Sequence, residues 1–367
     1  MNPAVQKTLS LVLLIVIGVL LKKKLQSREQ LGGIKLLILS IALPATIFVA
    51  LLKIQIEPSL LALPVLALGF NGVMLAATRA LLPAFGIQAG TAVSRTLMML
   101  LPSLAPGLTC FPFVMEYLGE EPLAWAALAD VGNKVFVLIL LYLLAMHWYH
   151  QRQRSAESGA SRLQGLLVSL VSEPVNLVIV GALVLLGFGL NLEALPGFLQ
   201  ESFLRMSAMM TPMVLLFIGL AVTLTRQQVR LIAALLSARA GFSMLVSAAL
   251  VALLGLTDPT AILLAVAFPL SACSFWPYAH MAAVEALEAT GERAQGGTFD
   301  LNLALVVLAV SLPFSTVLIL AVCSSGTLFA DPWVLSGTGG ALLLGGALPV
   351  VLGRLRGTPM ALAEPVS

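Results

Sequence analysis

The chain has 367 residues, of which 59% are hydrophobic and 10% are charged, and its mean hydropathy is +1.03. Soluble domains carry about a quarter charged residues, so this chain has too little polar surface for a water-soluble protein of its length. The net charge of +3 comes from basic residues scattered through short loops, so nucleic acid is not an expected partner. The composition excludes the soluble classes and indicates a protein that lies largely in lipid.

Apolar runs of roughly the length of a membrane-spanning helix, about 20 residues, follow one another along the chain. Charged residues or clusters of proline and glycine separate these runs. The sequence therefore predicts an all-α polytopic membrane protein with eleven spans. They cover residues 8–21, 34–52, 60–77, 96–118, 123–146, 166–190, 203–224, 231–256, 261–286, 301–323 and 333–352.

The loops between these runs alternate in their content of basic residues. With the N-terminus outside, 15 lysines and arginines fall on the cytoplasmic side and three on the outer side. Loops rich in these residues remain in the cytoplasm, so we expect a multi-pass protein of the plasma membrane, in bacteria the inner membrane, with a cytoplasmic C-terminus. The cytoplasmic set is Lys22, Lys23, Lys24, Arg28, Lys35, Arg79, Arg95, Arg152, Arg154, Arg162, Arg226, Arg230, Arg293, Arg354 and Arg356, and the outer set is Lys7, Lys53 and Arg205.

The longest hydrophilic stretch, residues 150–162, divides the first ten runs into two sets of five. Because five is odd, the second set enters the membrane upside down relative to the first. The sequence thus predicts inverted five-helix repeats at 1–149 and 166–325, a cytoplasmic loop at 150–165, and an eleventh span with a cytoplasmic tail at 326–367. Features that recur at separations of 168 to 170 residues support the repeat: Gly18 with Gly187, Pro44 with Pro212, Asp130 with Asp300, and Asn133 with Asn302.

The fourth and ninth runs are each interrupted by prolines, at residues 104–113 (LAPGLTCFPF) and 268–278 (FPLSACSFWPY). Proline leaves peptide groups unpaired, and the membrane interior tolerates these only where protein or a water-filled cavity surrounds them. Broken helices in two inverted halves indicate the central site of a transporter, where helix N-termini attract anions. Alternatively, the prolines only kink packed helices. The candidate substrate-binding residues here are Pro106, Gly107, Thr109, Cys110, Pro112, Ser271, Ser274 and Pro277.

Two charged residues, Asp130 and Lys134, lie inside the fifth run, four positions apart and therefore on one helix face. One interpretation is a structural ion pair. The other places Lys134 and Asn133 against an anionic substrate. In that case Asp130, with Asn302 of the second half, binds the coupling ion, Na⁺ or H⁺.

Three further polar residues within the runs are expected to be structural. Arg239 is expected to extend toward the cytoplasmic headgroups, and Asn71 to bind a neighbouring helix. His280 is expected to make a hydrogen bond within the packed bundle. The three cysteines have the spacing of neither metal ligands nor a disulfide framework, so we expect no metal site.

Several segments of the chain resemble the auxin efflux carrier family of permeases, within the larger group of bile acid and sodium symporters. The resemblance extends from Leu11 to Val322, and the order and spacing of its pieces carry it. These pieces are IGVLLKKKL (17–25), LPATIF (43–48), GLTCFPFVMEYLGEEPLAWAALADVGNKVF (107–136), EPVNLVIVGALVLL (173–186) and FIGLAVTL (217–224).

The resemblance implies ten helices in two inverted repeats, in which helices 4 and 9 cross at their broken centres to form the substrate site. It also implies an elevator-like motion and an organic anion as substrate, as malate, malonate and auxin are for family members. The chain departs from the family where Ala105 replaces an asparagine and Cys110 replaces the second glycine of a Gly-x-x-Gly-x-Pro pattern. The eleventh span is a further departure.

The predicted function is secondary active transport of a small organic anion, with no enzymatic activity and no cofactor. A sodium-driven bicarbonate or bile-acid-like symporter is the main alternative. A membrane-embedded enzyme is less favoured because H-E-x-x-H, G-x-S-x-G and Gly-rich phosphate-loop motifs do not occur. A channel is less favoured because it gives no reason for broken helices in two halves. Besides the anion, the lipid bilayer is an expected partner, and assembly as a homodimer is open.

Overall fold

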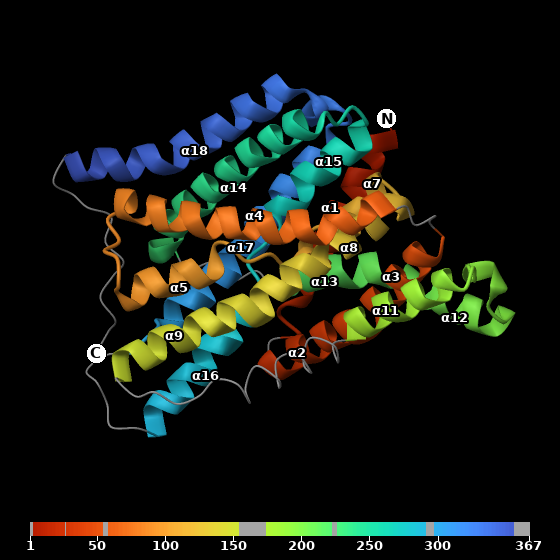
Figure 1. Cartoon of the computed structure of the whole chain (residues 1–367), viewed down its shortest axis with the longest axis horizontal. Helices are drawn as coiled ribbons and strands as arrows, with labels where there is room; N and C mark the ends of the chain where they lie inside the picture. The colour runs from red at the N-terminus through yellow and green to blue at the C-terminus, as the bar shows by residue number, and fades with distance from the viewer. Residues whose placement is uncertain are drawn as a thin grey trace.

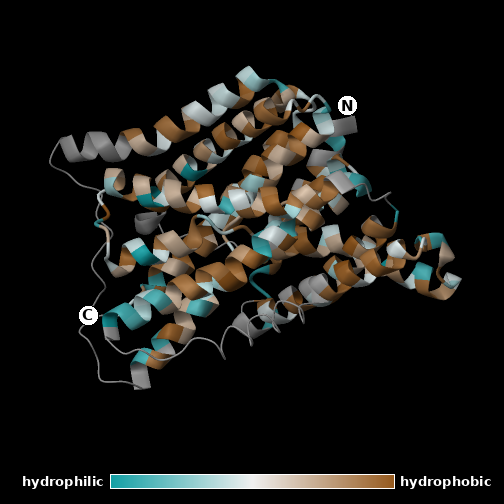
Figure 2. Ribbon diagram, in the orientation of Figure 1, coloured by the Kyte–Doolittle hydropathy of each residue, from teal (hydrophilic) through white to brown (hydrophobic). Residues whose placement is uncertain are grey.

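The computed structural model describes residues 3–25, 27–53, 58–153, 174–221, 226–290 and 297–355. Within these ranges the chain forms helices joined by short turns, and no strand occurs. Figure 1 shows most of the helices packed side by side, and Figure 2 shows that apolar residues predominate along them. Most of the predicted 150–165 loop and the tail beyond residue 355 lie outside the described residues.

Helix lies in every one of the eleven apolar runs, and the all-α prediction is confirmed. The first five runs contain α1 (Pro3–Leu21); α2 (Arg28–Leu37), η1 (Ile38–Ala42) and α3 (Leu43–Leu52); η2 (Pro58–Leu61), α4 (Ala62–Leu81) and η3 (Leu82–Phe85); α5 (Ala92–Leu100), α6 (Pro106–Thr109) and α7 (Phe111–Tyr117); and α8 (Glu120–Val135), η4 (Phe136–Leu140) and α9 (Leu141–Gln153). The other six runs overlap, in order, α11 (Pro174–Gly187); α12 (Gly197–Ala208) and α13 (Met210–Ala221); α14 (Arg226–Leu254); α15 (Pro259–Ala267), η6 (Phe268–Leu270) and α16 (Trp276–Thr290); α17 (Leu301–Ser324); and α18 (Pro332–Leu355). Two short 3₁₀ turns, η5 (Leu192–Ala194) and η7 (Leu328–Ala330), lie between runs.

Four helical stretches in the described part of the chain are long and apolar enough to cross a membrane: Ala62–Phe85, Glu120–Arg152, Arg230–Leu254 and Leu301–Ser324. Several shorter apolar helices accompany them. The composition and the helix lengths are therefore consistent with a membrane protein. The number of runs that span, and the sidedness of the termini, stay predictions from the sequence.

Both proline-rich runs are broken, as the sequence predicts. α5 gives way to the non-helical residues 101–105 before α6 begins at Pro106. In the second half, η6 ends at Leu270, and residues 271–275 are non-helical before α16 begins. Proline stands in the first turn of α6, α7 and η6. Its missing N–H has no intrahelical partner to lose there, so these prolines mark helix starts and not mere kinks.

The helices form two groups with most of their contacts inside each group, and α3 of the first group also packs against α8 of the second. In the first group, α1 packs along α13, and α3 packs against both α11 and α12. In the second group, α4 packs along α8, α14 contacts α17, and α16 contacts α9. The first two helical units of each predicted half thus belong to one group, and the last three units belong to the other. The breaks lie in the second group.

Three pairs of helices approach so closely that only glycine fits at the contact. A Cβ atom on Gly18 of α1 would lie 2.3 Å from the carbonyl oxygen of Leu216 in α13. One on Gly241 of α14 would lie 2.3 Å from the backbone nitrogen of Leu343 in α18, so the eleventh helix packs tightly on α14. Gly187, the predicted counterpart of Gly18, faces open space, so that recurrence does not reflect equivalent packing.

The tightest of these contacts joins α8 to α4, because a Cβ on Gly132 would lie 1.8 Å from the carbonyl oxygen of Pro64. We expect Gly132→Ala to separate the two helices and to lower the stability of the protein, by about 1–3 kcal/mol or more, since backbone atoms cannot move aside as a side chain can. The measurement is the temperature of aggregation of the purified protein in detergent. The control is Gly72→Ala in α4, where a Cβ meets nothing within 4 Å; equal melting of the two variants would contradict the close approach.

Candidate functional site

The two breaks are bonded directly to each other. Ala105 N donates to the carbonyl oxygen of Ala272 over 2.8 Å. Ala272 N in turn donates to Oγ1 of Thr109 over 3.1 Å, and Ser274 N donates to Oγ of Ser103 over 3.0 Å. Peptide groups that each broken helix leaves unpaired are therefore satisfied by the other break. Residues more than 160 positions apart in the chain meet at this point.

The hydroxyl groups at the breaks are buried and also bind backbone groups. Oγ1 of Thr109 donates to the carbonyl of Ala105, and Oγ of Ser271 donates to that of Phe268. Oγ of Ser274 accepts from the backbone nitrogen of Trp276. A hydroxyl has one donor and two acceptor positions, so each retains an acceptor position. The predicted polar residues of the two segments are thus brought together, and in this conformation they hold the breaks in place.

The other predicted residues of the breaks shape the backbone. Pro106, Cys110, Pro112 and Pro277 are buried among the breaks' packing contacts. Gly107 lies against α3, where an added Cβ would come within 2.8 Å of a methyl group of Leu43. The prolines and Gly107 offer no polar side chain to a substrate, so their contribution is the position of the peptide groups around the break, and the thiol of Cys110 is only a weak donor.

Arg239 does not extend toward the membrane surface, and the sequence-based expectation was wrong. Its side chain, on α14, is buried, with 5% of the residue exposed. Nε donates to the carbonyl oxygen of Leu101 over 2.6 Å, and Nη2 donates to that of Ser103 over 3.1 Å. The break leaves these carbonyls without helical partners, and a buried carbonyl requires a donor. This need holds the guanidinium in the interior.

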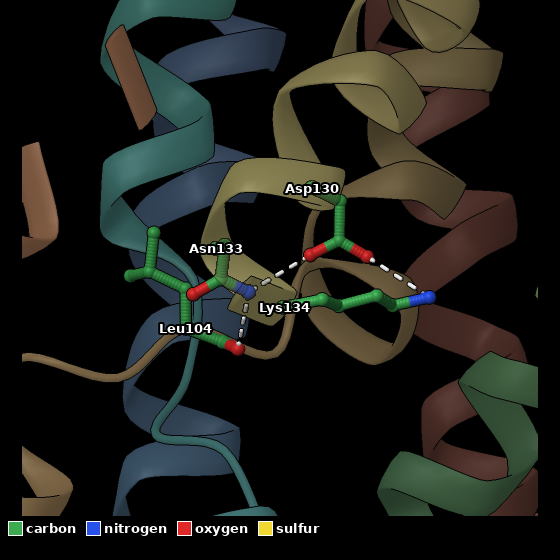
Figure 3. Close-up of polar contacts among 4 residues, drawn as sticks. All are labelled: Leu104, Asp130, Asn133 and Lys134. Atoms are coloured by element: carbon green, nitrogen blue, oxygen red, sulfur yellow. Dashed lines mark hydrogen bonds and ion pairs between the residues drawn. The ribbon is translucent and has the colours of Figure 1, made fainter. Parts of the chain in front are cut away.

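A polar cluster on α8 binds the first break (Figure 3). Nδ2 of Asn133 donates to the carbonyl of Leu104 over 3.0 Å and to Oδ1 of Asp130 over 2.8 Å. Oδ1 of Asn133 accepts from Nδ2 of Asn71 on α4 over 2.9 Å, so Asn71 binds a neighbouring helix as predicted. Nζ of Lys134 lies 3.6 Å from Oδ2 of Asp130, and both side chains are at least nine-tenths buried. The predicted ion pair is present.

Asn302 takes no part in this cluster. It is exposed in the first turn of α17, just after the N-cap residue Asp300. Its position 169 residues after Asn133 therefore does not produce an equivalent environment. The structure gives no support to its predicted role in binding a coupling ion.

Two serines contact the breaks without having been singled out from the sequence. Ser103 accepts from Ser274 and donates to the carbonyl of Leu100 over 2.6 Å. Ser311 of α17 accepts from the backbone nitrogen of Cys273 over 3.3 Å. Ser103 directly follows Pro102, so its place next to a helix-breaking proline could have identified it from the sequence. Ser311 carries no such signal, since only the packing of α17 brings it to the second break.

His280 has the packing role that the sequence predicts. Its Nε2 lies 2.9 Å from the carbonyl oxygen of Val137, and its ring meets Tyr142 edge-on with centroids 5.4 Å apart. Val137 lies in the π-helical turn η4, in which the hydrogen-bond pattern of a regular helix is interrupted. The imidazole joins α16 to this interruption.

A cavity of about 390 Å³ lies between the two groups of helices. Ser10, Leu14 and Thr211 line it from the first group, and Met115 and Glu116 of α7 line it from the second. α7 is the half-helix that continues from the first break. The cavity thus borders this half-helix, and the residues that bond the two breaks do not line it.

No model of a known protein family matches the sequence, and no curated protein matches it either. The likeness to auxin efflux carriers accordingly stays an expectation. The chemistry and position of the residues at the breaks carry the functional proposal.

The bonds of Arg239 predict a large structural effect of its removal. Arg239→Met leaves the carbonyls of Leu101 and Ser103 without donors, at a cost of about 1–3 kcal/mol for each group. We expect a clear loss of thermal stability in detergent, measured as the melting temperature of the purified protein. The control is Arg230→Met on the same helix, because Arg230 is exposed. Equal melting temperatures for the two variants would show that Arg239 does not stabilise the break.

Proposed function

We propose that this protein is a secondary active transporter of a small organic anion that binds where the two breaks meet. The observation that carries the proposal is the direct hydrogen bonding between two broken helices from the two halves of an apolar bundle. A protein whose helices only had to span the membrane would use continuous helices, because every interruption exposes peptide groups that must find hydrogen-bond partners. Paired interruptions are typical of transporter binding sites, where such groups recognise a substrate.

The charges near the breaks favour an anion. In the described part of the chain, the buried Lys, Arg, Asp and Glu side chains are Lys134, Arg239 and Asp130. Two cations against one carboxylate leave an excess of one positive charge in a region of low dielectric, where it acts strongly. The N-terminus of α16 at the second break adds a partial positive charge. A small carboxylate would neutralise this excess.

The two groups of helices support alternating access by relative motion. Both breaks belong to one group, and α7 contacts α13 of the other group beside the 390 Å³ cavity. A substrate held between the breaks would move with the group that contains them. This arrangement fits an elevator-like motion of one group against the other, as the family resemblance implies.

A specific observation favours a cation-coupled mechanism, with a sodium-driven symporter as the second candidate. Oδ1 of Asn71 is buried and has no hydrogen-bond partner among the described residues. It belongs to the side chain that binds Asn133, which in turn binds Asp130. An amide oxygen and a carboxylate are the hard oxygen ligands that a small cation or a proton-bearing group prefers. Sodium dependence of transport separates this candidate from a transporter that is coupled to protons.

The test of the proposal is counterflow in proteoliposomes with a panel of small carboxylates and bicarbonate, each with and without sodium. We expect saturable exchange of an anion, and at least a tenfold loss in Thr109→Val, which removes the acceptor of the Ala272 N–H. The control is Thr316→Val, since that buried hydroxyl donates to the carbonyl of Leu312 in its own helix over 2.8 Å, and no other bond of it occurs among the described residues. Flux without saturation would indicate a channel, and preference for cations would overturn the assignment of an anion.

The ion pair provides a separate prediction. We expect Asp130→Asn, Lys134→Met and the double variant all to lose counterflow, because the two side chains have different tasks if Lys134 attracts the substrate and Asp130 binds the coupling ion. A purely structural pair behaves otherwise: each single change strands a buried charge, whereas the double change strands none. Counterflow needs no ion gradient, so it reports substrate binding and movement. Restored exchange in the double variant would assign the pair to structure alone.

A further inference from the structure

A second cavity, of about 180 Å³, is lined by none of the residues that bond the two breaks. It is formed where α4 ends, α5 begins and α9 ends, at the left of the molecule in Figure 1. Its polar wall contains Arg79, Ser94, Arg95 and Gln151, and none of its lining residues is acidic. The positive-inside pattern predicts that this end faces the cytoplasm.

Hydrogen bonds to two carbonyl oxygens fix the guanidinium group of Arg95 at the cavity and leave some of its N–H donors unused. Nε donates to the carbonyl oxygen of Thr298 over 2.8 Å, and Nη1 donates to that of Gly90 over 2.6 Å. No hydrogen bond of Nη2 occurs among the described residues. Thr91 caps α5 by accepting from Ser94 N, so the positive end of this nine-residue helix adds to the field at the cavity.

The surroundings of Arg95 carry more positive than negative charge. Burial, followed by the nearby charge of Arg152, lowers the pKa of Arg95 from its ordinary value, and Glu288 opposes this effect. The carboxylate of Glu288 is engaged by the backbone nitrogen and the hydroxyl of Thr298. Arg152 donates to the carbonyl of Gly297 over 2.5 Å. Arg95 therefore lies near two other guanidinium groups, because Arg79 lines the same cavity and the charge of Arg152 acts on Arg95.

The opposite wall of the cavity is apolar. Leu82, Ile87 and Met98 line it, together with Trp148, whose ring meets Phe299 edge-on with centroids 6.0 Å apart. Tryptophan is enriched where membrane proteins meet the headgroup region. Basic pockets between membrane helices on the cytoplasmic side bind anionic headgroups, and guanidinium groups match the geometry of phosphate oxygens.

We propose that this cavity binds a phosphate-bearing anion through Arg79 and Nη2 of Arg95. The ligand is either the headgroup of an anionic phospholipid, whose glycerol and first methylenes would contact Leu82 and Met98, or a free phosphate compound that uses the polar wall alone. Binding neutralises the repulsion between Arg95 and Arg152 and so stabilises the contacts of α5 and α9 with residues 297–298. The proposal does not depend on transport, because no residue of the breaks takes part.

The experiment uses the full chain purified in detergent, with melting temperature and native mass spectrometry as readouts. The probes are phosphatidylglycerol, phosphatidylcholine and glycerol 3-phosphate. We expect phosphatidylglycerol to bind and to raise the melting temperature by several degrees, and phosphatidylcholine to do neither. An equal effect of glycerol 3-phosphate would support the site and identify a free phosphate compound as the ligand. No response to either anion would overturn the proposal.

Three variants test whether the anion binds at the 180 Å³ cavity. Arg79→Gln should weaken phosphatidylglycerol binding roughly tenfold, the loss expected for one charge-assisted contact. Gln151→Glu should weaken it as well, by placing a carboxylate at an exposed position of the polar wall. Both side chains are exposed, so the variants should fold as the unmodified chain does. Arg230→Gln, an exposed arginine outside the cavity, is the matched control; an equal loss of binding in that variant would show attraction by net charge only and would overturn the site.

Discussion

Peptide groups without helical partners, buried inside an apolar bundle, are the constraint on which the rest of this structure depends. Each break in the helices leaves N–H and C=O groups that lipid cannot satisfy. The protein meets this demand with side chains drawn from several elements: Arg239 from α14, Asn133 from α8, and Thr109 and Ser103 from the first break itself. Each of these side chains is buried and performs a structural task in this conformation.

The close helix contacts serve the same arrangement. Gly132 lets α8 touch the backbone of α4, and the next turn of α8 presents Asn133 to the first break, with the Asp130–Lys134 pair beside it. Gly241 similarly lets α18 cover α14, the helix that carries Arg239. Dense packing of this kind fixes side chains to within fractions of an ångström, because a backbone contact cannot relax as a flexible side chain can. The eleventh helix is thus part of the support for the breaks.

The charged residues near the breaks and those at the 180 Å³ cavity lie in different surroundings. Near the breaks, buried cations exceed buried carboxylates by one, and the low dielectric makes this excess selective for the sign of a bound solute. At the 180 Å³ cavity, the arginines are partly exposed, so water and salt screen them and several are required. The proposed transported ion would occupy the first environment, and the proposed phosphate-bearing ligand would occupy the second.

The sequence by itself determined the helical class, the eleven apolar runs and the two proline-rich breaks, because hydropathy and the missing proline N–H act locally along the chain. It also indicated the Asp130–Lys134 pair, since four residues make about one helical turn. Only the tertiary structure decided the partners. Arg239 was expected at the membrane surface, but carbonyls at Leu101 and Ser103, far away in the chain, hold it in the interior. Asn302 repeats Asn133 in position and yet is exposed, because burial depends on which helices pack against a residue, and spacing along the chain does not specify that packing.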